Sequence, residues 1–137
     1  MAEFFKALER AAAGEETPLG AVLDALPFDD RGLLPAIAQD AESGEVLMLA
    51  WVSRAALERT LTDGYACYYS RSRQALWLKG ESSGHRQALV SLRLDCDGDA
   101  VLYRVRQEGP ACHTNRPTCF YLEVDGSMVR VLTDPVA

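Results

Sequence analysis

The sequence predicts a single α+β domain in which a mostly antiparallel, curved sheet is accompanied by a few helices. Two observations lead to this expectation. Short apolar or alternating runs recur along the chain and are separated by clusters of Asp, Ser and Gly, a pattern typical of antiparallel strands. Only one helical pattern lies among those runs, and the others are confined to the N-terminus. The length of 137 residues suits one domain with its own core.

Residues 1–26 are predicted to form a helical extension ahead of a main domain that spans residues 27–137. The segment Glu3 to Ala13 has apolar residues along one side and should form a short helix. A second helix should run from Thr17 to about Leu26, because Thr-Pro supplies an N-cap and a first-turn proline. No residue of this extension suggests chemistry.

A β-hairpin followed by a helix is predicted next. The apolar runs Leu33 to Gln39 and Val46 to Val52 flank the turn-forming segment Asp-Ala-Glu-Ser-Gly. Ser53 can cap a helix that runs to about Thr62, and the Asp-Gly that follows should end it. The remaining strands are expected at residues 65–70, 75–79, 85–94, 101–107, 118–124 and 127–132. Alternation along the 85–94 run predicts an apolar face of Ala88, Val90, Leu92 and Leu94 and a polar face of Gln87, Ser91 and Arg93.

Charge and composition exclude some classes of function. The formal net charge of −6 argues against a general nucleic-acid or membrane surface, so phosphate binding would need a local basic patch. No apolar run approaches the length of a transmembrane helix, and the charged start lacks the apolar core of a signal peptide. The four cysteines are therefore expected to be thiols of a cytoplasmic protein.

A dense acidic cluster stands at Asp95-Cys96-Asp97-Gly98-Asp99. If this segment is extended, its three carboxylates share one face and Cys96 points to the other. Carboxylate oxygens suit Mg²⁺ or Ca²⁺, whereas a thiolate suits Zn²⁺, so the cluster could serve two different metals. The alternative is a solvated acidic turn before a strand.

Three cysteines, Cys96, Cys112 and Cys119, can supply soft metal ligands. The Cys-x6-Cys spacing of the last two matches no standard structural zinc finger. A zinc ion with three protein ligands keeps its fourth position for water, which is the catalytic arrangement. His113 could be the fourth ligand and close the site, or it could act as a general base. The alternative is two buried cysteines and a third by chance; Cys67, in a predicted strand, is expected to be a buried apolar residue.

The segment from Ser70 to His85 is rich in hydrogen-bond donors that suit phosphate oxygens, namely Ser70, Arg71, Ser72, Arg73, Lys79, Ser82 and Ser83. Trp77 could stack on a base, although an aromatic residue in a strand more often belongs to the core. His85 is a candidate for a second proton-transfer group or for a structural residue. Two ordinary polar loops are the alternative reading of the whole segment.

The motifs DCDGD (95–99), PACHT (110–114) and KGESSGH (79–85), preceded by SRSR (70–73), resemble those of the phosphoribosyl-AMP cyclohydrolase family in order and spacing. The resemblance runs from about residue 27 to 123. Two residues depart from the family pattern, Asn115 where glycine is usual and Ser82 where threonine is usual. Asn tolerates the left-handed backbone that a glycine can occupy, and Ser82 keeps a hydroxyl.

The resemblance implies a zinc- and magnesium-dependent hydrolase of histidine biosynthesis. Its substrate would be 1-(5-phosphoribosyl)-AMP, whose N1–C6 bond water opens to give phosphoribosylformimino-AICAR-phosphate. Zinc would be shared in a homodimer, with Cys96 from one subunit and the other two cysteines from its partner, and His113 or else His85 would move a proton. Magnesium on the three aspartates would neutralise a substrate phosphate, and the donors of residues 70–83, with Trp77, would hold the rest of the substrate. The alternative is a non-catalytic, zinc-stabilised interaction module, with a closed four-ligand site and no use for the aspartates.

Overall fold

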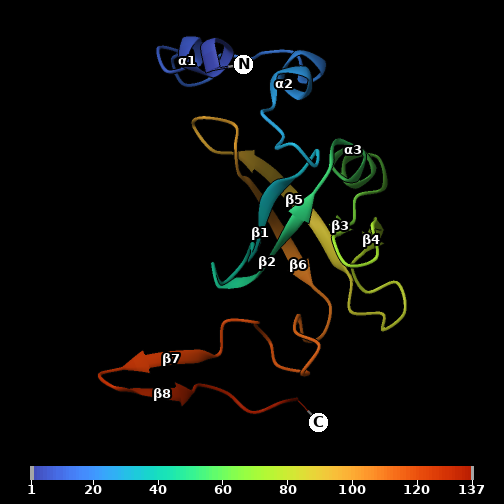
Figure 1. Cartoon of the computed structure of the whole chain (residues 1–137), viewed down its shortest axis with the longest axis vertical. Helices are drawn as coiled ribbons and strands as arrows, with labels where there is room; N and C mark the ends of the chain where they lie inside the picture. The colour runs from blue at the N-terminus through green and yellow to red at the C-terminus, as the bar shows by residue number, and fades with distance from the viewer. Residues whose placement is uncertain (1, 137) are drawn as a thin grey trace.

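Eight strands and three helices follow one another along residues 2–136, the part of the chain that the computed structural model describes (Figure 1). The helices are α1 (Ala2–Leu8), α2 (Leu19–Ala25) and α3 (Arg54–Asp63). The strands are β1 (Leu34–Asp40), β2 (Val46–Val52), β3 (Cys67–Ser70), β4 (Ala75–Leu78), β5 (Gln87–Leu94), β6 (Val101–Gln107), β7 (Leu122–Asp125) and β8 (Met128–Val131).

The first six strands form one curled sheet in the order β4-β3-β2-β1-β6-β5, and β7 and β8 form a separate hairpin. Neighbouring strands are antiparallel except β1 and β6, which are parallel. The sheet curls until β5 meets the chain just before β3. There the N–H of Ala66 donates to the carbonyl of Gln87 and the N–H of Leu89 donates to that of Gly64, both at 2.9 Å. The predicted α+β class with a mostly antiparallel, curved sheet is confirmed, and the homodimer stays a prediction.

The central helix begins and ends as the sequence predicts. The hydroxyl of Ser53 accepts the N–H of Ala56, and Gly64 takes the left-handed conformation just after the last turn of α3. The N-terminal helices are shorter than expected. Helix α1 ends at Leu8, and residues 9–13 are all exposed, so packing against the body does not stabilise further helical turns there. Pro18, and not Thr17, stands at the N-cap position of α2, without a capping side chain.

The predicted faces of β5 are wrong in its first half. The side chain of Gln87 is fully buried and Leu89 packs against the core, whereas Val90 is exposed. A bulge between Leu89 and Ser91 causes this difference, because one extra residue exchanges the faces of all residues beyond it. The faces are as predicted after the bulge, where Leu92 and Leu94 pack against the core.

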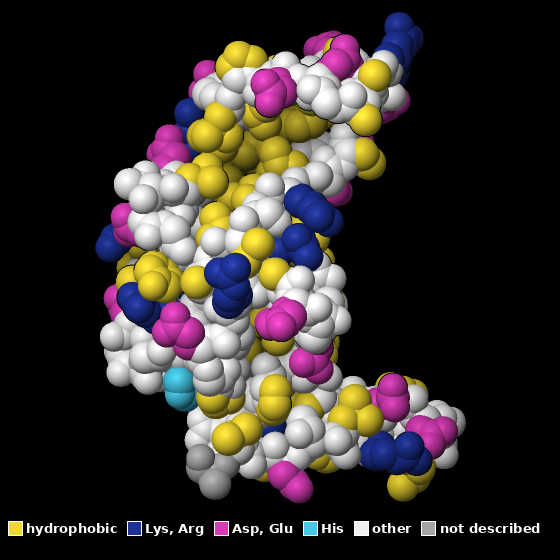
Figure 2. Space-filling view, turned by 180° about the vertical axis from the view of Figure 1, so that it is seen from behind, with side chains coloured by type: hydrophobic (Ala, Val, Ile, Leu, Met, Phe, Trp, Pro, Cys, Tyr) yellow, Lys and Arg dark blue, Asp and Glu magenta, His cyan; other side chains and the backbone are white. Residues whose placement is uncertain are grey.

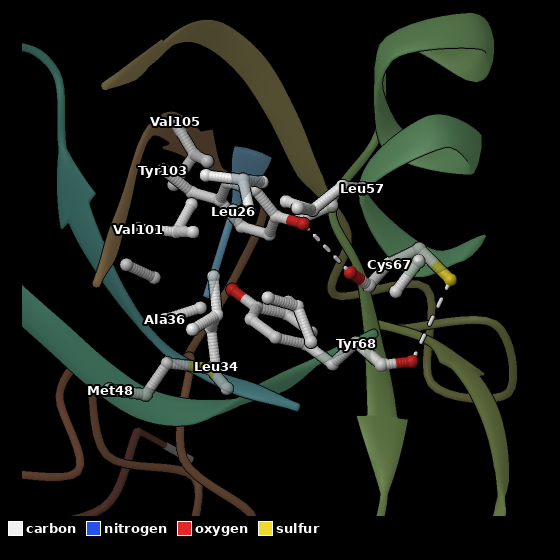
Figure 3. Close-up of a cluster of buried hydrophobic side chains, with 14 of the residues drawn as sticks. Leu26, Leu34, Ala36, Met48, Leu57, Cys67, Tyr68, Val101, Tyr103 and Val105 are labelled. Atoms are coloured by element: carbon white, nitrogen blue, oxygen red, sulfur yellow. Dashed lines mark hydrogen bonds between the residues drawn. The ribbon is translucent and has the colours of Figure 1, made fainter. Parts of the chain in front are cut away.

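The core inside the curl contains two buried tyrosines whose hydroxyls are satisfied by neighbours (Figure 3). The hydroxyl of Tyr103 donates to the carbonyl of Cys67 at 3.0 Å, and the hydroxyl of Tyr68 donates to Oε1 of Gln87 at 2.6 Å. Cys67 is fully buried, as predicted. Across residues 2–136, every helix is too short or too polar to cross a membrane.

Replacing Tyr68 with Phe should lower the free energy of unfolding by about 1–3 kcal/mol, because it leaves the carbonyl oxygen of the buried Gln87 side chain without its donor. Urea unfolding at one fixed protein concentration measures the difference. Tyr69→Phe is the matched control, since Tyr69 is only partly buried and the same hydroxyl is lost. Equal midpoints for the two variants would show that the buried hydrogen bond contributes nothing.

Candidate functional site

A cavity of about 330 Å³ lies where the 79–85 loop meets the 110–115 loop. Its walls bring together most of the predicted substrate and proton-transfer residues with one predicted zinc ligand, namely Arg73, Trp77, Lys79, Ser82, Ser83, His85, Cys112 and His113. Both histidines therefore line the same space. The cavity joins cations, hydroxyls, imidazoles and a thiol, which are the groups needed to bind an anionic substrate and to move a proton.

Lys79 connects the two loops. It follows directly after β4, and its ammonium Nζ donates to the carbonyl of Ala111 at 2.7 Å. Burial lowers the pKa of Lys79, and the nearby Cys119 and Cys112 only partly oppose that shift. A cation is thus held at the wall of the cavity and close to two thiols.

The 79–85 loop is closed tightly at Gly80. The backbone of this glycine has φ of +81°, and a Cβ at this position would stand 2.4 Å from the carbonyl carbon of His85. The N–H of His85 donates to the hydroxyl of Ser83 at 3.2 Å, and its ring lies against Gly109. A side chain at position 80 would clash with the backbone of His85, so the closed loop that places His85 at the cavity requires a glycine there.

Cys112 and Cys119 lie next to each other because their loop folds back on itself. The N–H of Cys112 donates to the carbonyl of Arg116 at 3.1 Å, and the N–H of Cys119 donates to the carbonyl of Leu47 in β2 at 2.7 Å. Asn115 turns this loop with φ of 65°, a left-handed conformation that asparagine tolerates. The loop thus holds two potential metal ligands side by side near the start of β2.

The two thiols differ in how readily they ionise. The pKa of Cys112 is lowered. Burial acts to raise it, but two hydrogen bonds from Thr114 outweigh burial. One comes from the Thr114 hydroxyl, which donates to Sγ at 3.1 Å, and the other from the Thr114 N–H. Burial of the Cys119 thiol, although the residue as a whole is exposed, and the neighbouring Cys112 raise the pKa of Cys119 to about 11. Cys112 is therefore the thiol of the pair that ionises first.

Cys96 lies far from this pair, in the turn between β5 and β6. Figure 1 shows that turn at the end of the sheet nearest α1, whereas the chain beyond β6 continues from the opposite end. The ring of Phe5 in α1 packs against Gly98 of the same turn. Within residues 2–136, no three His, Cys, Asp or Glu side chains come together to hold a metal ion. One copy of the chain therefore does not assemble the three-cysteine set.

The acidic cluster is a turn and not an extended strand, so the predicted alternation of its side chains does not apply. Oδ1 of Asp95 accepts the N–H groups of Asp97 at 3.2 Å and Asp99 at 3.0 Å, which folds the segment around that carboxylate. Burial acts to raise the pKa of Asp95, but the hydrogen bonds from Asp99 and the turn amides outweigh it, so the pKa is lowered. The Asp95 carboxylate raises the pKa of Asp99.

The other predicted substrate residues line a second cavity of about 510 Å³. Ser70, Arg71 and Ser72 belong to it, and Trp77 lines both cavities. The guanidinium carbon of Arg71 stands 4.6 Å from the centre of the Trp51 ring, a cation–π contact. Arg31 and Trp51 also line this cavity and were not predicted, because a lone Arg in a turn and a Trp in an apolar strand carry no motif.

Comparisons with known proteins agree on one family. A sequence model of the phosphoribosyl-AMP cyclohydrolase family matches residues 48–121. A protein named phosphoribosyl-AMP cyclohydrolase from Alkalilimnicola ehrlichii is 61% identical over 131 residues, which cover 96% of this chain and 92% of the relative. Phosphoribosyl-AMP cyclohydrolase 2 from Pseudomonas fluorescens is 60% identical over 94% of this chain and 88% of its own length. A relative of the same family name from Halorhodospira halophila is 60% identical, covering 93% and 89%.

Proposed function

The chain belongs to the phosphoribosyl-AMP cyclohydrolase family and is a hydrolase, and from that premise we propose that it opens the N1–C6 bond of 1-(5-phosphoribosyl)-AMP in histidine biosynthesis. In this reaction the oxygen of water bonds to C6, the bond from C6 to N1 breaks, and N1 takes a proton. The product is phosphoribosylformimino-AICAR-phosphate. The observation that supports this proposal best is the cavity in which Lys79, His85, Cys112 and His113 meet.

We propose zinc as one cofactor, held by Cys112 and Cys119 of one chain and Cys96 of a second copy. The chemistry of the donor set fits, since two adjacent thiols lie at the 110–115 loop and the hydrogen bonds from Thr114 lower the pKa of Cys112. Bound zinc would lower the pKa of a water molecule at the reaction centre. A homodimer follows from this assignment, because the third thiol lies at the opposite end of the sheet from the other two.

The residues of the chain itself would bind the substrate and move protons. Arg73, Lys79 and the hydroxyls of Ser82 and Ser83 supply donors for one phosphate, and Arg71 with Ser70 and Ser72 supplies donors for the other, now joined by Arg31. Trp77 lines both cavities and can stack on the base between them. His113 would carry the proton to N1, with His85 as the second candidate. A cytoplasmic location stays a prediction.

Magnesium is the second proposed cofactor, for Asp95, Asp97 and Asp99 together. The described residues do not gather these three carboxylates into a metal site, so the turn would have to rearrange around the ion. Asp97→Asn removes one charge at nearly constant shape, so the Mg²⁺ concentration for half-maximal activity should rise by roughly tenfold or more while bound zinc stays unchanged. Activity titrations with Mg²⁺ and metal analysis measure both quantities. Loss of zinc with an unaltered Mg²⁺ response would reverse the assignment of the two metals.

Turnover of phosphoribosyl-AMP by the purified, zinc-loaded protein tests the proposed function. We expect ring opening that depends on both zinc and Mg²⁺. A non-catalytic zinc-stabilised module would bind zinc, show no turnover and ignore Mg²⁺. A protein that stays folded, holds zinc and leaves phosphoribosyl-AMP intact at every Mg²⁺ concentration would contradict the proposal.

A further inference from the structure

The β7–β8 hairpin projects from the body of the molecule as an arm (Figure 1). One face of this arm is wholly aliphatic. Cross-strand partners share a face, and successive residues alternate between the two faces. The pairs Leu122–Val131 and Val124–Val129 therefore form one face, and the pairs Glu123–Arg130 and Asp125–Met128 form the other. The four aliphatic side chains are 53–75% exposed.

Such a face needs a partner. A two-stranded hairpin is marginally stable in water by itself, and a contiguous exposed apolar face typically marks an interaction site. Figure 2 shows the arm standing away from the body at the end opposite the N-terminal helices. At its root, the N–H of Leu132 donates to the carbonyl of Tyr121 at 2.8 Å, which fixes how the arm leaves the body.

We propose that a second copy of this chain covers the aliphatic face, with the end of the molecule that carries α1 and the β5–β6 turn. This inference rests on the shared zinc site proposed above. Cys119 lies only three residues before β7, so a second copy that brings its Cys96 to Cys119 also brings its β5–β6 turn to the root of the arm.

Helix α1 accompanies that turn, because the ring of Phe5 packs against Gly98. The four residues of β7 reach about 13 Å from the root, and the seven residues of α1 span about 10 Å, so α1 is long enough to cover most of the arm. The N-terminal helices, which suggest no chemistry, thereby gain a role as part of the surface that receives the arm of the other subunit.

Two matched substitutions test the arm. Val124→Lys places a charge on the aliphatic face, whereas Met128→Lys makes the same replacement of an equally exposed apolar residue on the other face, opposite Asp125. Sedimentation of the zinc-loaded proteins over a range of concentrations gives the dissociation constant of the dimer. Val124→Lys should raise it by about a hundredfold or more, because a charge must be buried, and Met128→Lys should change it by less than about threefold. Circular dichroism checks that both variants are folded.

A photo-cross-linking amino acid at position 124 adds a direct readout that needs no loss of function. In mixtures of isotopically light and heavy chains, we expect cross-links between light and heavy chains that map to residues 2–8 or 95–99. Equal dissociation constants for the two lysine variants, or cross-links confined to single chains, would contradict the proposal that a second copy covers the aliphatic face. That result would stand even if the shared zinc site were confirmed by its own test. A wild-type protein that sediments as a monomer with full zinc would instead contradict the shared zinc site. It would also contradict the proposed contact between the arm and a second copy, which rests on that site.

Discussion

Cys112→Ser should abolish measurable turnover and reduce bound zinc from about one ion per chain to almost none. The substitution removes the thiol that ionises most readily of the adjacent pair, and a hydroxyl is a poor zinc ligand. A catalytic metal supplies several kcal/mol of transition-state stabilisation, so the loss in kcat/KM should be at least about 10³-fold. Turnover assays and metal analysis of the same preparation measure both effects.

Cys67→Ala is the matched control for that experiment. Cys67 is also a free thiol, but it is fully buried in β3, and its carbonyl, which takes part in the core hydrogen bonds, is retained in the variant. This variant should lose some stability and keep its zinc and its rate. If Cys112→Ser retained wild-type zinc, Cys112 would not be a ligand and the assignment of the three-cysteine set would be wrong.

His113→Ala should lower kcat by about 10²–10⁴-fold while zinc content stays at the wild-type level, because a positioned proton carrier typically contributes that much. His113 lines the same cavity as Lys79 and Cys112, where the substrate would react. A ligand role would instead fill the position that water needs on the metal. Steady-state kinetics and metal analysis separate the two roles.

His85→Ala is the natural companion, since this imidazole lines the same cavity from the other loop. A folded but zinc-free His113→Ala protein would make His113 a ligand and leave His85 as the better proton carrier. A larger rate loss in His85→Ala than in His113→Ala, with zinc intact in both, would exchange the roles of the two histidines.

Local signals in the sequence predict elements whose ends are set by their own residues. Ser53 and Gly64 define α3 because capping and left-handed backbone are local properties, and the 101–107 alternation matches β6 in full. The bulge at Val90 could not be predicted, because it depends on pairing with β6 and leaves the composition of the strand unchanged.

The candidate site was predictable in its residues and not in its arrangement. The motifs identified the lining of the first cavity, because the 79–85 and 110–115 loops keep their residues together along the chain. Arg31 joins Arg71 only through the curl of the sheet, which no spacing in the sequence records. The separation of Cys96 from Cys112 is an exception, because the two residues flank β6 and the predicted 101–107 strand already places them at opposite ends of one extended segment.

The claim that two copies of the chain build each zinc site is tested most directly by mixing two inactive variants, Cys96→Ser and Cys112→Ser, and letting their subunits exchange. In a shared-site dimer the mixed species pairs one doubly damaged site with one intact site. About half of the dimers would be mixed, so activity should return to about a quarter of that of wild-type protein carried through the same procedure. A mixture that exchanges subunits and stays inactive, while the treated wild type remains active, would contradict the shared site.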